Sequence, residues 1–346
     1  MRCIQSDDLA LRAAVARLSC LSFAERLSLL KKLDNVSALA LLSIEELCNI
    51  LSIDKSVERV AKIPDLAQLA ARAERDVSIM KQYGVTMLLP GDEKYPVRLR
   101  EIPQPPFALY CRGCIDILSD EGVGVVGTRH PDGAGIKAAF SFARDCAEHG
   151  MNVVSGLAFG IDTAAHKGAL DADCGKTVAV LGCGIDIIYP AANKRLAAEI
   201  IKRSGCIVSE YPPEEPGVKW HFPERNRIIS GLTSATMVIE APNKSGALIT
   251  ADFALEQGRD LCVHPVGVSF AEMLRKNNEA KKSFVNVGML PTDKKIGGKT
   301  GSNKTDGLLE PGGVLQLVED GAPVISSYSE LKALISGKMH QGLLDL

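Results

Sequence analysis

The sequence predicts an α/β fold: a Rossmann-like, doubly wound and mainly parallel sheet, preceded by a small helical N-terminal domain. From Gly122 onward, short apolar segments alternate regularly with longer amphipathic segments at helical spacing. The short segments are mainly apolar, which is typical of parallel strands buried on both faces. Residues 1–80, in contrast, carry only the helical spacing. These three observations predict two domains, at 1–80 and 81–337.

The N-terminal domain is predicted to be a bundle of short helices, similar to a SAM or helix-hairpin module. Leucines recur at helical spacing between Leu18 and Leu33. Ser43 is followed three residues later by Glu46, the pattern of a capping box at a helix start. We interpret this domain as a packing module without chemistry of its own.

The second domain is expected to start with an edge segment and to continue as the parallel sheet. Prolines between residues 96 and 106 exclude long helices there. The predicted strands are 85–89, 109–111, 123–127, 152–155, 177–181, 206–209, 235–240 and 260–264. The predicted helices are 136–149, 162–170, 193–201, 224–232, 247–257 and 328–335, and residues 338–346 are expected to form a frayed tail.

Residues 268–311 interrupt this pattern. They are rich in lysine mixed with Asn, Gly, Ser and Asp, a composition that cannot bury a core. We expect a flexible insertion, at least in its second half, that is either a tolerated insertion or a supplementary DNA-binding loop.

Composition limits the classes of partner and site. The net charge of −2 and the pI near 6.3 provide no general attraction to nucleic acid, so any anion site must be a local basic patch. The ten cysteines follow no disulfide framework, and the pair Cys111 and Cys114 has no second pair, which argues against zinc. Acidic residues near the start argue against a signal peptide, and no apolar run reaches the ~18 residues of a membrane span. We expect a cytoplasmic protein.

Glycine-rich turns follow several of the predicted strands, where parallel sheets bind ligands. Glycines let the backbone approach a ligand, and helix N-termini offer N–H groups to phosphate. The basic residues expected to converge there are Arg129, Lys194, Arg225 and Arg227. The sequence therefore predicts an anion pocket at this edge of the sheet.

The stretch 219–231 combines basic and aromatic residues and leads into a helix that Pro223 is well placed to open. Such a stretch suits a phosphate backbone and a stacked base. It equally suits a structural loop whose aromatic residues lie in the core and whose arginines form ion pairs. The sequence leaves both interpretations open.

Three other patterns are weaker evidence for a ligand site or a catalytic group. Gly122, Gly124 and Gly127 match a dinucleotide-binding spacing, but they lie inside a strand rather than in the turn after it. Asp162 and His166 share one helix face and could form an acid–base or metal pair, although we favour a cap and a packed histidine. Glu240 at a strand end could act as a general base.

At these strand ends the sequence resembles the DNA-processing protein A (DprA/Smf) family over about residues 85–267 and again at 313–322. The shared motifs are Gly127–Arg129, Ser155–Asp162 with His166, Gly182–Asp186 with Tyr189 and Pro190, Ser209–Pro212, Phe222–Gly231, and Glu240–Ala241 with Ser245–Thr250. So many ordered matches are far more specific than any single motif.

The resemblance implies a homodimeric, non-enzymatic protein that binds single-stranded DNA, protects it and loads the recombinase RecA during natural transformation, with no cofactor. By motif position, Arg129, Lys194, Arg225 and Arg227 would contact phosphates, and Gly127, Ser155, Gly156 and Asn226 would shape the pocket. Thr128, Asn193 and Phe222 complete the expected DNA site. Phe159, where the family often has a basic residue, is expected to stack on a base or to pack. The dimer surface is expected around residues 314–318 and the following helix.

The competing function is that of a nucleotide-binding enzyme of the phosphoribohydrolase type, with Glu240 or Asp162 as the acid or base. An enzyme needs a closed pocket with a poised carboxylate, whereas a mediator needs basic residues along a groove. Because the basic residues come from several separate strand ends, the sequence favours the groove.

Overall fold

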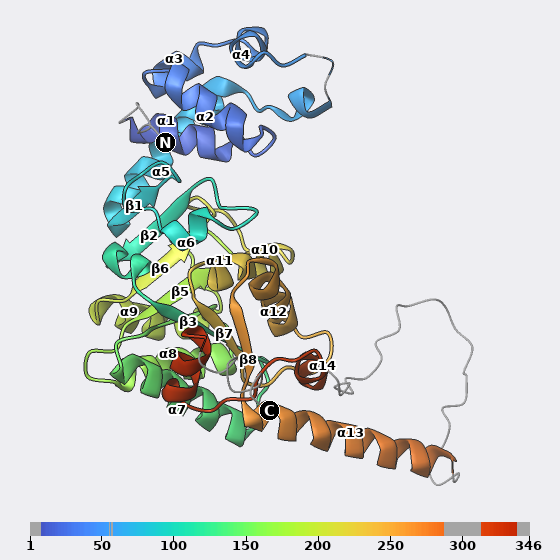
Figure 1. Ribbon diagram of the computed structural model, residues 1–346. Helices are drawn as coiled ribbons and strands as arrows, with labels where there is room; N and C mark the ends of the chain where they lie inside the picture. Colours follow the sequence, from blue (N-terminus) through green and yellow to red (C-terminus); the bar gives the residue numbers. More distant parts are fainter. Residues whose placement is uncertain (1–7, 55, 57, 287–312, 338–346) are drawn as a thin grey trace. The chain divides into compact units, whose positions relative to one another are not determined.

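The computed structural model describes residues 8–54, 56, 58–286 and 313–337, with residues 277–286 described by their backbone alone (Figure 1). The chain divides into two compact units. Unit 1 consists of residues up to 120 together with 176–232, and unit 2 of residues 121–175 together with those from 233 onward. Each unit is therefore assembled from two separate segments of the chain.

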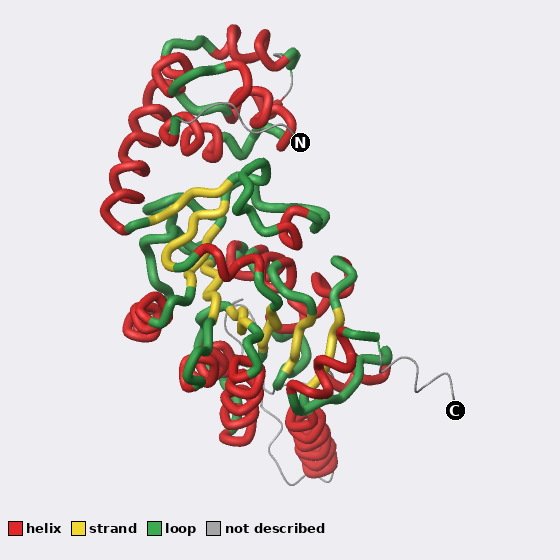
Figure 2. Tube along the Cα trace, turned by 60° about the vertical axis from the view of Figure 1, so that its left-hand side comes forward, coloured by secondary structure: helices red, strands yellow, loops and turns green. Residues whose placement is uncertain are grey.

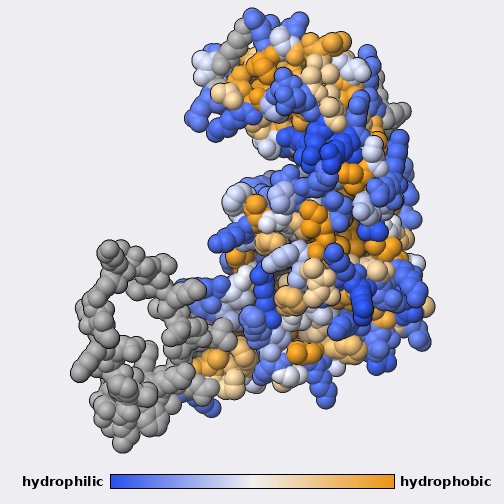
Figure 3. Space-filling view, turned by 180° about the vertical axis from the view of Figure 1, so that it is seen from behind, coloured by the Kyte–Doolittle hydropathy of each residue, from blue (hydrophilic) through white to orange (hydrophobic). Residues whose placement is uncertain are grey.

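The N-terminal part of unit 1 is helical, as predicted. Its elements are α1 (Leu9–Arg17), α2 (Phe23–Lys32), α3 (Val36–Ala40), α4 (Ile44–Leu51), the 3-10 helix η1 (Glu58–Lys62) and α5 (Leu66–Tyr83). The predicted capping box at Ser43 and Glu46 is present at the start of α4. Gly84 ends α5 in the left-handed conformation, and the chain then enters the first strand (Figure 2). Some hydrophobic residues of this region are visible on its surface (Figure 3).

The rest of unit 1 is built on four strands in the order β1-β2-β6-β5. Its elements are β1 (Val85–Leu88), α6 (Val97–Arg100), β2 (Leu109–Gly113), η2 (Ile115–Ser119), β5 (Thr177–Leu181), η3 (Ala191–Asn193), α9 (Lys194–Lys202), β6 (Cys206–Ser209), α10 (His221–Glu224) and α11 (Asn226–Gly231). Strands β5 and β6 are parallel, whereas β2 pairs antiparallel with both β1 and β6. The segment 85–113 thus extends the sheet as an edge, as expected.

The helix predicted at 224–232 is wrong in its bounds. The structure has two short helices, α10 and α11, that meet at Arg225. At the junction the Ile228 N–H donates to the Arg225 carbonyl at 2.9 Å, a tighter turn than that of an α-helix. Pro223 is the third residue of α10 rather than the first. A proline is tolerated throughout the first turn, since N–H groups there have no partner inside the helix.

Unit 2 is a four-stranded parallel sheet in the order β4-β3-β7-β8. Its elements are β3 (Gly122–Val126), α7 (Gly133–Glu148), β4 (Asn152–Ser155), α8 (Ile161–Asp171), β7 (Ala235–Val238), α12 (Gly246–Glu256), β8 (Asp260–Val263), α13 (Pro265–Asn286), α14 (Gly313–Glu319) and α15 (Tyr328–Ile335). The connections β3–α7–β4 and β7–α12–β8 run outward in opposite directions. Right-handed crossovers then place α7 and α12 on opposite faces of the sheet. The predicted doubly wound, mainly parallel fold is confirmed.

The segment 268–311 was predicted to be flexible at least in its second half, and its first part is a helix. α13 extends from Pro265 to Asn286, while residues 287–312 lie outside the described part of the chain. Phe270 and Ala271 are buried, so one side of this helix packs at its start, whereas Lys276 is exposed. The predicted last helix is present as α15, and the tail 338–346 lies outside the described residues. The domain boundary near residue 80 stays a prediction.

None of the helices in the described ranges is long and apolar enough to cross a membrane.

Candidate nucleic-acid interface

In unit 2 the strand order reverses between β3 and β7, and parallel sheets bind ligands beyond the carboxyl ends of their strands at such a point. β3 is followed by Gly127, Thr128 and Arg129. The Thr128 N–H donates to the Glu240 carbonyl at 2.7 Å, and the Ile161 N–H donates to the Thr128 carbonyl at 3.2 Å. Thr128 thus joins the loops that follow β3 and β7 to the start of α8.

The loop after β4 lies against the loop after β3. A Cβ added at Gly160 would lie 2.5 Å from the Thr128 carbonyl oxygen and 2.8 Å from the Arg129 carbonyl carbon. Gly160 has a φ of +77°, so glycine meets both the backbone conformation and the close approach. Arg129 and Phe159, on the two sides of this contact, are both exposed. The two loops therefore present a cation and an aromatic ring on one surface.

Ser155 and Gly156 support this surface from below. The Ser155 hydroxyl is fully buried and donates to the Val125 carbonyl at 2.7 Å, so its hydrogen bond holds β4 to β3. Gly156 is buried as well. These two residues shape the loop rather than offering side-chain atoms to a ligand.

Asp162 and His166 are both buried in α8. Asp162 does not cap the helix as predicted, because the N-cap residue is Gly160. Its carboxylate instead accepts from the Ala158 N–H at 3.3 Å, within the loop after β4. The packed histidine is confirmed. Among the residues described, no cluster of three or more His, Cys, Asp or Glu could hold a metal ion.

Glu240 is fully buried beneath the loop after β3. Its Oε2 accepts from the Asp132 N–H at 3.3 Å, and Gly135 leaves the space that its carboxyl group occupies. Burial, followed by the negative charge of Asp132, raises the pKa of Glu240 to about 7. Oε1 has no hydrogen-bond partner in the described part of the chain. A carboxyl group so deeply buried is not placed to act on a ligand as a general base.

The predicted site residues Arg225, Asn226 and Arg227 lie in unit 1 and are all buried. Arg225 donates through Nη1 to the Val180 carbonyl and through Nε to Asn226 Oδ1, the latter at 3.0 Å. Arg227 Nη2 pairs with Glu210 Oε2 at 2.5 Å. Burial raises the pKa of Glu210, against the opposing effect of the Arg227 charge. For these arginines, the structure favours the interpretation of a structural loop.

Lys194 is the exposed first residue of α9, and Asn193 before it is buried. Phe222 is half-buried against Gly182, where an added Cβ would lie 2.9 Å from the ring. Its ring centroid is 5.2 Å from that of Tyr189. Lys194 is therefore the predicted site residue of unit 1 whose charge is accessible.

Tyr189 was not predicted as a DNA-binding residue, and Trp220 was considered only as part of the stretch 219–231. Tyr189 is 54% exposed and Trp220 is 66% exposed, although large aromatic side chains are usually buried. Trp220 is the only tryptophan of the chain, and the exposed Lys219 precedes it. That pairing of a lone tryptophan with a lysine was the available signal in the sequence. Exposed aromatic and basic side chains together are suited to stacked bases and phosphates.

Comparisons with known proteins identify the family of this chain. The family model described as DNA recombination-mediator protein A matches residues 86–285. Protein Smf of Synechocystis is 45% identical over 185 residues, which are 52% of this chain and 46% of that protein. The DNA processing protein DprA of Streptococcus pneumoniae is 45% identical over 174 residues, 50% of this chain and 61% of its own. The chain thus matches about half to three-fifths of the length of these two relatives.

Solved structures extend the likeness. The structure of DprA from Streptococcus pneumoniae has a TM-score of 0.64 and 30% identity, and the match covers 94% of this chain and 97% of that one. A DprA structure from Helicobacter pylori, which is described by its single-stranded DNA binding mode, has a TM-score of 0.54 and 25% identity over 75% of this chain and 97% of that one. Since the family model covers more than half of the chain, this protein belongs to the DNA recombination-mediator protein A (DprA/Smf) family.

Proposed function

We propose that this protein is a recombination mediator that binds and protects single-stranded DNA and loads RecA onto it in natural transformation. The observation that carries the proposal is the pair of loops after β3 and β4. They are held together by the contacts of Thr128 and Gly160 and expose Arg129 and Phe159. A backbone phosphate at Arg129 and a base on Phe159 would use both features.

Further support comes from unit 1, where Lys194, Tyr189 and Trp220 are exposed. Neither group of residues requires a large net positive charge of the protein, because a basic residue attracts a phosphate at short range. We further propose that the protein acts without cofactor or catalysis, since Glu240 and Asp162, the candidate acids, are buried.

The proposed homodimer would use α14 and α15. Val314 and Leu317 are buried within unit 2. The residues of α14 that remain for a second copy are the exposed Gln316 and Glu319 and the half-exposed Leu315 and Val318. Dimerisation places two DNA sites on one strand and raises their effective concentration. RecA loading is the part of the proposal that rests on the family resemblance.

Arg129→Ala should weaken binding of labelled oligothymidine and reduce the magnitude of the salt slope by about 0.7, the value for one phosphate contact on a single strand. The melting temperature should stay unchanged, because the side chain is exposed. Fluorescence anisotropy across a salt series, with a duplex of the same length for comparison, measures both. Arg144→Ala is the matched control, since Arg144 is an exposed arginine of α7 in the same unit. A folded wild-type protein without preference for the single strand would rule out the proposed function.

The emission of Trp220 should be quenched when unlabelled oligothymidine binds, because a stacked base contacts the exposed indole. As the chain holds one tryptophan, the signal reports on this position alone. Trp220→Ala should weaken binding by about 1–3 kcal/mol without changing the salt slope. Leu255→Ala, which truncates an exposed apolar residue of α12, is the control. Saturable binding with unchanged emission would place Trp220 outside the interface.

A further inference from the structure

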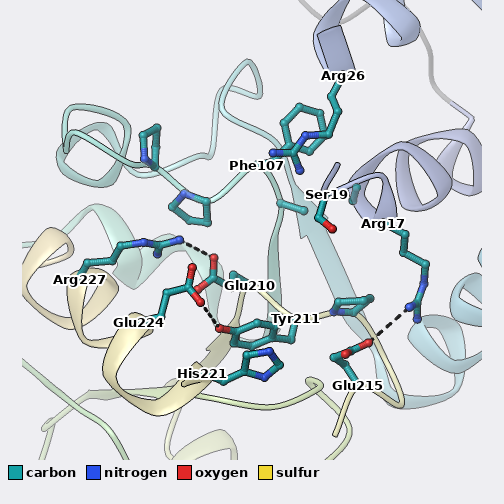
Figure 4. Close-up of a pocket in the computed structure, with 15 residues that line it drawn as sticks. Arg17, Ser19, Arg26, Phe107, Glu210, Tyr211, Glu215, His221, Glu224 and Arg227 are labelled. Atoms are coloured by element: carbon teal, nitrogen blue, oxygen red, sulfur yellow. Dashed lines mark hydrogen bonds and ion pairs between the residues drawn. The ribbon is translucent and has the colours of Figure 1, made fainter. Parts of the chain in front are cut away.

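Unit 1 contains a cavity of about 420 Å³ between its N-terminal helices and its sheet. Arg17 and Arg26 reach it from the helical region, and Phe107 reaches it from the segment before β2 (Figure 4). The opposite wall is formed by residues of the segment after β6 and of α10 and α11, namely Glu210, Tyr211, Pro212, Glu215, His221, Glu224 and Arg227. The volume lies in the range of small-molecule binding sites.

Arg26 provides the cavity with a cation to which no described residue serves as counter-ion. Its guanidinium carbon lies 4.3 Å from the centre of the Phe107 ring, and burial lowers its pKa. In the described part of the chain it forms no ion pair, and its Nε is buried without a hydrogen-bond partner. Arg17 differs, because it makes a bidentate ion pair with Asp76 at 2.5 and 2.8 Å. A partly buried arginine without a carboxylate is a ready partner for an anion.

The opposite wall holds an acceptor without a donor. Glu210 Oε2 is bound by Arg227, but Oε1 is buried and accepts no hydrogen bond within the described residues. The Nδ1 atom of His221 is also buried without a hydrogen-bond partner among the described residues. The histidine ring stacks on Tyr211 with 3.8 Å between centroids. Buried polar atoms of this kind usually have partners, so a ligand with a matching donor would satisfy them.

These two walls define the chemistry of the ligand. It must carry an anionic group for Arg26 and an N–H donor for Glu210 Oε1. Because Arg227 already balances the charge of Glu210, a neutral donor suffices and a second cation is not required. Flat walls from Phe107, Tyr211 and two prolines, Pro105 and Pro106, favour a planar aromatic body. An amine-bearing base joined to a phosphate meets all of these conditions.

We propose that this cavity binds one nucleoside monophosphate, with its phosphate at Arg26 and the amine of its base at Glu210. The site would be separate from the surface formed by Arg129 and Phe159, and its existence does not depend on the proposed function. The same chemistry is offered by a free mononucleotide and by the 5′-phosphorylated end of a DNA strand.

Isothermal titration of the full chain with deoxyadenosine 5′-monophosphate tests the proposal. Arg26→Met should weaken binding at least about tenfold, the effect of losing one charge-assisted hydrogen bond. Arg59→Met is the matched control, since Arg59 pairs with Glu25 and does not line the cavity. The analogue whose purine carries no amine should bind more weakly than the adenine nucleotide. Equal binding by Arg26→Met and wild type would overturn the proposal.

A second titration identifies the source of the nucleotide. An oligothymidine that begins with a 5′-phosphorylated deoxyadenosine should compete with the mononucleotide if strand ends are bound, and should not compete if the ligand is free. Either result supports the site, provided that Arg26→Met abolishes it. Absence of saturable binding by both ligands to the folded wild type would refute it. Unphosphorylated oligothymidine, which lacks both the terminal phosphate and the amine, reports on the DNA surface separately and should bind Arg26→Met and wild type alike.

Discussion

Glu240→Gln should raise the free energy of unfolding at pH 8 by about 3 kcal/mol. It should also remove most of the decrease in that free energy that the wild type shows as the pH rises from 4.5 to 7. The ordinary pKa of this carboxyl group is 4.5, and in the folded protein it rises to about 7. The folded state therefore holds the proton more tightly than the unfolded state does. The stabilisation is complete below about pH 4.5 and is lost as the pH rises through 7. Glutamine resembles the protonated form at every pH.

Urea denaturation at a series of pH values measures this effect. Glu256→Gln is the matched control, because Glu256 is an exposed residue of α12 in the same unit, and it should keep the slope of the wild type. A variant at position 240 with the pH dependence of the wild type would show that Glu240 is ionised in the folded protein without cost. The loop that carries Arg129 rests on this residue, so DNA binding should be compared at both ends of the pH range.

Arg227→Ala should lower the free energy of unfolding by about 3–5 kcal/mol, the range for removing one partner of a buried ion pair. The remaining Glu210 would be a buried carboxylate without its cation. Replacing both residues by methionine should recover most of the loss, because two apolar side chains leave no charge unpaired. Urea denaturation of Arg227→Met, Glu210→Met and the double variant measures the coupling between the two residues.

The same variants separate fold from function at the most basic stretch of the chain. If Arg227 is structural, the double variant should bind oligothymidine much as the wild type does. A single variant of undiminished stability that has lost DNA binding would show instead that Arg227 acts on the strand. Arg225 donates to the Val180 carbonyl, so we expect its replacement to lower the free energy of unfolding as the replacement of Arg227 does.

The strands were predictable from sequence almost residue by residue. Segments such as 152–155 and 177–181 are short, rich in valine and bounded by turns, which is the pattern of a buried strand. The junction at Arg225 was not predictable, because a turn stabilised by contacts of its own side chain breaks a continuous helical pattern. The helix at the start of the lysine-rich segment was not predicted, because a lysine-rich composition is compatible with a helix surface as well as with a loop.

The strand ends were sufficient to locate the candidate site in the sequence. The directions in which its side chains point could not be predicted. An arginine has the same appearance in a sequence whether it faces a phosphate or pairs with an acid 17 residues earlier, as Arg227 does with Glu210. Likewise, nothing in the local pattern distinguished the packed Phe222 from the exposed Tyr189 beside it. These differences arise from tertiary contacts that no local spacing records.

The division of each unit into two chain segments has a consequence for biosynthesis. Strand β2 pairs with β6, which joins Tyr110 to Ser209, so the sheet of unit 1 is incomplete until almost 100 further residues have left the ribosome. Strand β3 similarly pairs with β7 through Val123 and Ala235. Both units therefore mature late and almost together, and such distant pairing slows folding. An exposed, half-built sheet is prone to aggregation, so synthesis of this chain should depend on chaperones more than its size alone would suggest.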